Sequence, residues 1–89
     1  MKTKKDADYS FNHTRDRLLE RYDITITRAF YDGMCKDIKD LTSDVTLIDI
    51  EKQKDDTQMI FDIKYKFIES IRVVWSDERA CITTAIKRR

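Results

Sequence analysis

The feature that most constrains the fold is a change in the spacing of apolar residues near residue 44. Before it, apolar side chains recur every three or four residues, which is the period of an amphipathic helix. After it they alternate, so that Met59 and Phe61 are separated by Ile60 and followed by Asp62. Alternation is typical of a half-buried strand. The chain is therefore expected to form helices first and strands second.

The helical part divides into two segments. A first helix is predicted over residues 12–22, with Ser10 or Asn12 as its N-cap, and residues 1–10 are expected to be a loose lead-in. Its apolar side is predicted to hold Phe11, Leu18, Leu19 and Tyr22. A second helix is predicted from a cap at Thr25 to Lys39. Its apolar stripe is predicted to hold Ile26, Ala29, Phe30, Gly33, Met34 and Ile38.

The remaining residues are predicted to form about four strands. They fall at residues 45–51, 59–66, 71–75 and 80–87, with turns at 52–56, within 66–70 and at 76–79. Because helices and strands do not alternate, we expect one α+β domain over residues 1–89, with two N-terminal helices packed on one face of a roughly four-stranded antiparallel sheet. Gly33 is the sole glycine, which excludes the glycine-rich loops that bind ATP or NAD.

The cysteines and the histidine do not predict a metal site. Cys35 and Cys81 are far apart in sequence and His13 is the only histidine, so no zinc-ligand spacing exists. We expect neither a metal nor a cofactor, and we expect both cysteines to be packing residues with reduced thiols. No apolar run is long enough to cross a membrane and the first residues are polar, which predicts a cytoplasmic protein.

Charge is distributed unevenly, although the net charge is only +1. Residues 1–22 carry six basic and four acidic side chains, residues 23–63 carry five and ten, and residues 64–89 carry seven and three. A fold that places the first helix beside the last strands would gather the positive charge on one face. Such a distribution is compatible with a polyanion bound at that face only.

One stripe of the first predicted helix combines a proton carrier with two cations. His13, Arg17 and Arg21 are four residues apart and therefore fit one flank of about two turns. Imidazole and guanidinium groups that point in one direction are suited to handling a phosphate. The structural alternatives are a solvated basic flank, or ion pairs of the two arginines with Asp16, Glu20 or acidic residues of the sheet.

Two segments resemble a known family. Phe11-Asn-His13-Thr-Arg-Asp-Arg17-Leu-Leu-Glu-Arg21 and Arg72-Val-Val-Trp75, with Ala80-Cys-Ile-Thr83-Thr84, are similar to small RelE-like and ParE-like toxin domains. In the short forms of that family, the first helix carries His-x-x-x-Arg-Leu-x-x-Arg and the last strand ends in two apolar residues and a threonine. The resemblance covers about residues 11–87. The acidic middle departs from the translation-blocking members, which are basic throughout.

The resemblance implies metal-independent RNA cleavage, the usual activity of the wider group that includes barnase, EndoU and colicin nucleases. It implies that His13 moves a proton, while Arg17 and Arg21 hold the scissile phosphate. Thr83 or Thr84 would add a hydroxyl, and only one is expected to face the helix because strand neighbours point to opposite sides. Alternatively, both threonines are ordinary strand formers.

Further basic and aromatic residues complete the predicted RNA interface. Phosphate-binding candidates are Lys64, Lys66, Arg72, Lys87 and Arg88. Trp75, Tyr65 or Phe67 could stack an unpaired base, although their strand-like spacing equally favours the core.

These patterns lead to two functional hypotheses. The first is a RelE-like endoribonuclease that acts as a toxin or as a phage or mobile-element effector, with RNA as substrate and an antitoxin covering its basic face. The second is a non-enzymatic interaction module that binds and inhibits a host protein through its acidic central region. Because ParE-like relatives act on DNA gyrase instead of RNA, the fold alone does not choose between the two hypotheses.

Overall fold

Two helices precede a four-stranded antiparallel sheet in the computed structural model, which describes residues 4–65 and 68–87 and the side chains of residues 8–64 and 70–87. Helix α1 spans Lys4–Tyr22 and α2 spans Arg28–Asp40. The strands are β1 (Val45–Lys52), β2 (Thr57–Tyr65), β3 (Ile68–Ser76) and β4 (Cys81–Ile86). They lie in the order β1-β2-β3-β4, each antiparallel to the next. The predicted α+β architecture is confirmed.

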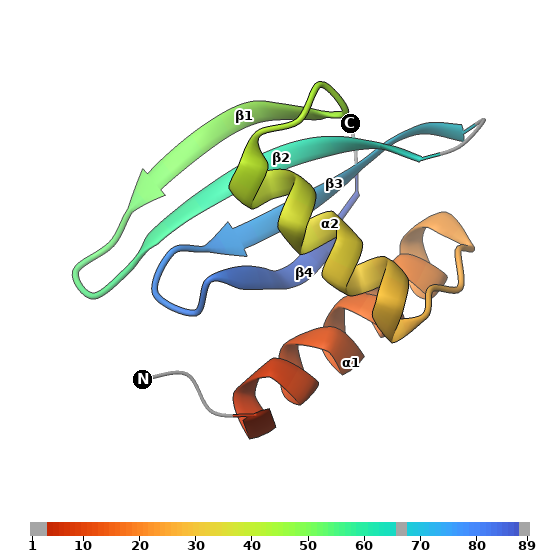
Figure 1. The fold of residues 1–89 in the computed structure, drawn as a ribbon, viewed down its shortest axis with the longest axis horizontal. Coiled ribbons are helices and arrows are strands. Elements are labelled where there is room, and N and C mark those ends of the chain that lie inside the picture. Colours follow the sequence, from red (N-terminus) through yellow and green to blue (C-terminus); the bar gives the residue numbers. More distant parts are fainter. Residues whose placement is uncertain (1–3, 66–67, 88–89) are drawn as a thin grey trace.

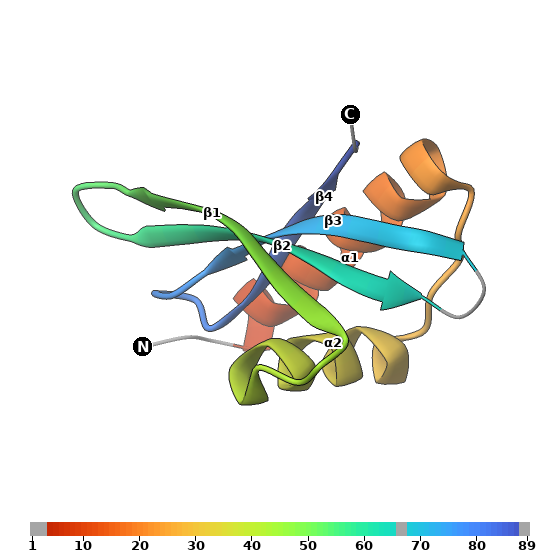
Figure 2. The ribbon, with the colours of Figure 1, turned by 90° about the horizontal axis from the view of Figure 1, so that it is seen from above.

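The core lies between α2 and the face of the sheet that α2 crosses (Figures 1 and 2). From the helix it receives Tyr31, Met34, Cys35 and Ile38, and from the sheet Phe61, Ile63, Ile71, Val73, Trp75, Ile82 and Ala85. Alternate strand residues point to this face, as the sequence period predicted. Cys35 and Cys81 are both buried, in agreement with a packing role.

Helix α1 runs along β4 and covers the outer edge of the sheet (Figure 2). Tyr22 Oη donates to Ile86 O at 2.6 Å and Thr14 Oγ1 lies 3.5 Å from Ile82 O, while the α2 residue Tyr31 donates to the same Ile82 carbonyl at 2.6 Å. The Thr14 and Tyr31 side chains satisfy a carbonyl group that an edge strand otherwise exposes, whereas Tyr22 Oη also accepts from Arg72 N–H at 3.1 Å and so bridges β3 and β4.

The loose lead-in expected over residues 1–10 is wrong for residues 4–10, which belong to α1, while residues 1–3 lie outside the described residues. The stripe that α1 buries is Ser10, Thr14 and Leu18, spaced four residues apart and at most 1 % exposed. Two of these residues are small and polar, so a search for apolar periodicity does not find the first half of the helix. Leu19 was predicted to face the core and is instead exposed.

Helix α2 is capped by Thr27, two residues after the predicted Thr25. Thr27 Oγ1 accepts a hydrogen bond from Phe30 N at 3.1 Å, which satisfies one of the free amides at the helix start. Ala29 and Gly33, which were predicted to belong to the apolar stripe, are exposed. The helix is rotated so that Tyr31 enters the core instead.

Candidate functional site

His13 lies on α1, on the side that opens toward the turns at the end of the sheet. It is half-buried, and its ring stacks on that of Tyr9 one turn earlier, with centroids 6.1 Å apart and an interplanar angle of 11°. The next residue, Thr14, is fully buried against β4 and fixes the rotation of the helix. The imidazole is thereby held beside the sheet.

His13 borders an open polar pocket of about 460 Å³. The pocket is lined by Tyr9, His13, Gln53, Asp56, Gln58, Ser76, Glu78, Arg79, Thr83 and Thr84. These residues come from α1, from β4, from the adjoining ends of β2 and β3, and from the two turns that join β1 to β2 and β3 to β4. A pocket of this size accommodates part of an extended ligand.

Both threonines of β4 line this pocket, contrary to the expectation that only one would face it. The cause is an irregularity in the β3–β4 ladder, where Val74 pairs with Thr84 but Trp75 pairs with Ile82. Thr83 is therefore an extra residue, and the alternation of side chains is interrupted there. Thr83 Oγ1 donates to Val74 O at 3.3 Å, and Thr84 Oγ1 lies 3.5 Å from Ala85 O.

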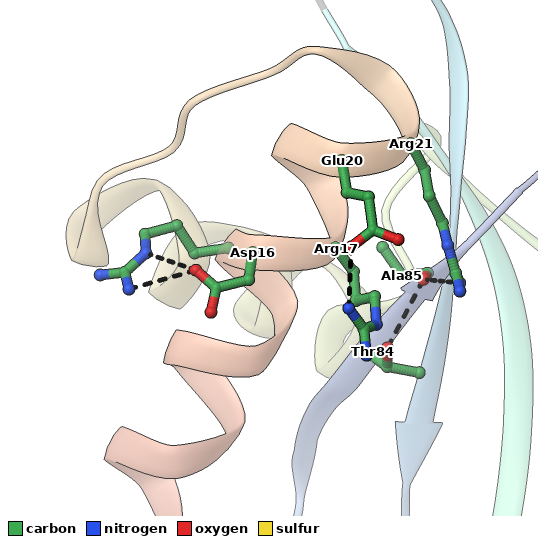
Figure 3. Close-up of polar contacts among 7 residues, drawn as sticks. Asp16, Arg17, Glu20, Arg21, Thr84 and Ala85 are labelled. Atoms are coloured by element: carbon green, nitrogen blue, oxygen red, sulfur yellow. Dashed lines mark hydrogen bonds and ion pairs between the residues drawn. The ribbon is translucent and has the colours of Figure 1, made fainter.

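Arg17 and Arg21 do not belong to the pocket lining, although they lie on the same helix as His13. Arg17 pairs with Glu20 at 2.9 Å, and Arg21 donates to Ala85 O at 2.8 Å (Figure 3). The structural alternative of an Arg17–Glu20 pair is thus present. Arg21 fastens α1 to β4, since its bond to a backbone carbonyl joins two elements distant in sequence.

The cation that lines the pocket is Arg79, which the sequence analysis did not single out. Arg79 lies in the turn between β3 and β4, where Ala80 adopts a left-handed conformation with φ of 54°. Its backbone N–H donates to Ser76 Oγ at 3.2 Å. Within the described residues its guanidinium makes no hydrogen bond or ion pair. The nearby Glu78 carboxylate likewise has no hydrogen bond in the described part of the chain, while the Glu78 N–H donates to Asp56 at 3.0 Å.

Asp56 links two segments of the pocket lining. Its carboxylate accepts from Ser76 Oγ at 2.6 Å and from Glu78 N at 3.0 Å, so it ties the turn after β1 to the turn after β3. The Ser76 hydrogen bond, more than any other contact, lowers the pKa of Asp56. The carboxylate is therefore ionised at neutral pH and acts as a fixed acceptor that positions the turn carrying Glu78 and Arg79.

The other predicted RNA contacts do not gather at this pocket. Lys64 and Lys87 are exposed, whereas Arg72 forms a two-pronged pair with Asp62, at 2.8 and 3.1 Å, which raises the pKa of Arg72. Trp75 belongs to the core, and its indole N–H donates to Asp77 at 3.2 Å. Lys66, Phe67 and Arg88 lie outside the described residues, as does the side chain of Tyr65.

Comparison of the chain with protein-family models, with curated proteins and with solved structures finds no match. Within residues 4–65 and 68–87, no helix combines the length and the apolar character that crossing a membrane requires. In the same residues, no three histidine, cysteine, aspartate or glutamate side chains are grouped as metal ligands would be.

Proposed function

We propose that the pocket beside His13 cleaves RNA without a metal ion. One observation carries this proposal: the imidazole of His13, the carboxylate of Glu78 and the guanidinium of Arg79 line one pocket, together with the two threonines of β4. Neither the Glu78 carboxylate nor the Arg79 guanidinium has a hydrogen-bond partner in the described residues. A proton donor, a proton acceptor and a cation are the groups that phosphodiester transfer from a ribose requires. The family resemblance of residues 11–87 favours the same reaction and, with it, a role as a toxin or mobile-element effector.

In this mechanism the ribose 2′-hydroxyl attacks the adjacent phosphorus and the 5′-oxygen of the next nucleotide leaves. One of His13 and Glu78 accepts the proton of the attacking hydroxyl, and the other donates a proton to the leaving oxygen. The products are a 2′,3′-cyclic phosphate and a free 5′-hydroxyl. Imidazole is suited to either role because its ordinary pKa is close to neutral.

Arg79 is assigned the task that the resemblance gave to Arg17 and Arg21. Its guanidinium lines the pocket and is available to the phosphate, where forked donors stabilise the charge that grows in the transition state. Arg17 would have to leave Glu20, and Arg21 would have to leave the Ala85 carbonyl, before either bound a ligand. The two threonine side chains line the same pocket, and either hydroxyl would have to leave its contact with a strand carbonyl, Val74 O or Ala85 O, before it donated to a phosphate oxygen.

The proposal is tested with purified protein, end-labelled single-stranded RNA and an excess of EDTA. We expect cleavage that leaves 2′,3′-cyclic phosphate ends, and no cleavage of a matched strand at a position where one 2′-hydroxyl is replaced by hydrogen. Cleavage at that deoxy position would contradict the mechanism, because its nucleophile would be missing. Intact RNA in every reaction would contradict the proposed activity.

Paired arginine variants test the assignment of the cation. Arg79→Ala is expected to lower the cleavage rate by about 100-fold, the usual effect of removing one group that stabilises transition-state charge. Arg17→Ala is the matched control, since it removes the same side chain from an exposed ion pair. Equal losses in the two variants would contradict the assignment of Arg79.

A further inference from the structure

Exposed apolar side chains gather at the free edge of the sheet. Among the described residues, the large apolar side chains that are exposed are Tyr9, Leu19, Leu41, Leu47, Ile48 and Ile50. The last four lie on β1 or on the short segment that leads from α2 to it. Isolated exposed apolar residues are common, but a cluster on one strand indicates a contact surface.

The cluster borders an apolar groove of about 470 Å³ beside the C-terminal end of α2. It is lined by Ile38, Lys39, Leu41, Leu47, Met59, Phe61, Trp75 and Asp77. The groove and the proposed RNA site lie on different sides of β3. Of two consecutive residues of this strand, Trp75 lines the groove and Ser76 lines the polar pocket. The groove therefore lies on the opposite face of the sheet, and its role is independent of RNA cleavage.

Leu41 is unfavourable for the isolated protein in two respects. Its side chain is 70 % exposed, and its backbone has φ of 51° and ψ of 53°, the left-handed conformation that glycine adopts most easily. A glycine or asparagine at this helix end would cost less. An apolar side chain retained there at the mouth of a groove indicates a contact that the isolated chain lacks.

The backbone of β1 is also open to a partner. In the part of the chain that the structure describes, β1 pairs only with β2 and lies at the outer position of the sheet, over the eight residues Val45–Lys52. The opposite edge strand, β4, has carbonyl groups satisfied by side chains of both helices. Along β1, Ile50 N–H donates to the Asp49 carboxylate at 2.8 Å, and the pairing with β2 shifts register between Leu47 and Asp49, so the edge is interrupted near its middle; in the described residues no other hydrogen bond joins a side chain to the β1 backbone. An extended segment can add to such an edge.

Charge decides between a second copy of this chain and another partner. β1 carries Asp49 and Glu51 against Lys52, and the region 23–63 around it has twice as many acidic as basic residues. Symmetric pairing of two β1 strands about their midpoint would bring the two Asp49 carboxylates close to the symmetry axis. Like charges across paired strands are destabilising. A partner with basic side chains would instead be attracted.

We propose that β1 binds an extended segment of a partner protein in which basic residues alternate with apolar ones. The segment adds as a fifth strand to the sheet. Its apolar side chains contact Leu41 and Leu47 at the groove, and its basic side chains lie near Asp49 and Glu51. The main-chain hydrogen bonds of the added strand supply affinity, and the alternation of side chains supplies selectivity.

The test uses a fluorescein-labelled peptide of eight residues, the length of β1, in which lysine alternates with valine. Fluorescence anisotropy against the full chain is expected to report saturable binding that weakens as salt is added. A peptide with glutamate in place of lysine is expected to bind at least about tenfold more weakly. A lysine–valine peptide with every second amide N-methylated, which cannot form the ladder, is expected to lose binding.

Variants of the protein locate the binding surface. Leu47→Ser is expected to weaken binding about fivefold, and Leu19→Ser is the matched control because that leucine is similarly exposed, at 51 % against 47 %, but lies on α1. Glu51→Gln is expected to weaken binding at low salt without changing the groove. Leu41→Gly removes an apolar contact at the groove in a variant that is expected to fold, because glycine relieves the left-handed strain.

Any of the following results would overturn the proposal. The first is no binding of the lysine–valine peptide at concentrations up to about 1 mM, the weak limit of measurable affinity. The second is equal binding of the three peptides, or an equal effect of Leu47→Ser and Leu19→Ser. The third is dimerisation of the protein in sedimentation equilibrium that is abolished by Leu47→Ser, which would assign the edge to a second copy.

Discussion

Removal of the Tyr31 hydroxyl group tests how the sheet edge is closed. Tyr31 is 2 % exposed, and its phenol donates to Ile82 O at 2.6 Å. In Tyr31→Phe that buried carbonyl retains only Thr14 Oγ1 at 3.5 Å, the limit of a hydrogen bond. A buried acceptor without a good donor costs about 1–3 kcal/mol, and the weak Thr14 contact offsets part of this. We expect the free energy of unfolding to fall by about 1–2 kcal/mol.

Urea denaturation followed by circular dichroism measures this change, with Tyr9→Phe as the control at an exposed tyrosine. The control is expected to stay within about 0.5 kcal/mol of wild type. Burial, above all, raises the pKa of the Tyr31 phenol. The contribution of the buried neutral phenol to the free energy of unfolding is therefore fully present below the unfolded-state pKa of about 10. Above that pH it is lost at about 1.4 kcal/mol per pH unit.

Tyr31→Phe is accordingly expected to lose less stability than wild type between about pH 10 and pH 11, because it lacks the buried phenol that ionises on unfolding. Two results would refute the reasoning. One is a stability change at neutral pH no larger than that of Tyr9→Phe. The other is a decline at alkaline pH as steep in Tyr31→Phe as in wild type.

Three further predictions concern stability. Leu18→Ala, at a fully buried position, is expected to lower the free energy of unfolding by about 2–5 kcal/mol, whereas Leu19→Ala, at the exposed next position, is expected to stay within about 0.5 kcal/mol of wild type in thermal or urea unfolding. Similar losses in the two variants would show that α1 is rotated differently. Leu41→Gly is expected to stabilise the fold by roughly 0.5–1 kcal/mol, and destabilisation would contradict the assigned strain. Hydrogen bonds lower the pKa of Asp56, so the stability that its carboxylate contributes is present above about pH 4 and is lost as the pH falls through the lower folded-state pKa. Asp56→Asn is therefore expected to reduce the loss of stability at acidic pH, and an unchanged loss would count against the role given to Ser76.

Most of the fold could be predicted from the sequence because it is encoded in local periods. The change from helical to alternating spacing near residue 44 predicted both the element types and their order, and short turns between strands predicted antiparallel pairing. The ends of the elements were less predictable. Helix α1 buries Ser10 and Thr14 where it approaches β4 closely, and small polar residues at such a contact leave no apolar signal.

The site was predictable only where it depends on regular geometry. The helical stripe identified His13, and the family resemblance indicated Thr83 or Thr84, both of which line the pocket beside it. An extra residue in β4, however, turned both threonines to one pocket, and a turn with a left-handed Ala80 brought in Arg79. Bulges and left-handed residues other than glycine have weak sequence signals, because no single residue type marks either of them. The ion pair of Arg17 with Glu20 also depended on a choice among several available partners.

The central claim is that His13 moves a proton during RNA cleavage. The most direct measurement compares the cleavage rate of wild type with that of His13→Ala on the same labelled RNA in EDTA, after circular dichroism has established that both proteins are folded. Loss of a positioned acid or base lowers a rate by about 100- to 10,000-fold, and a loss in that range is the predicted result. Equal rates in the two proteins would contradict the assignment of His13 and the mechanism built on it.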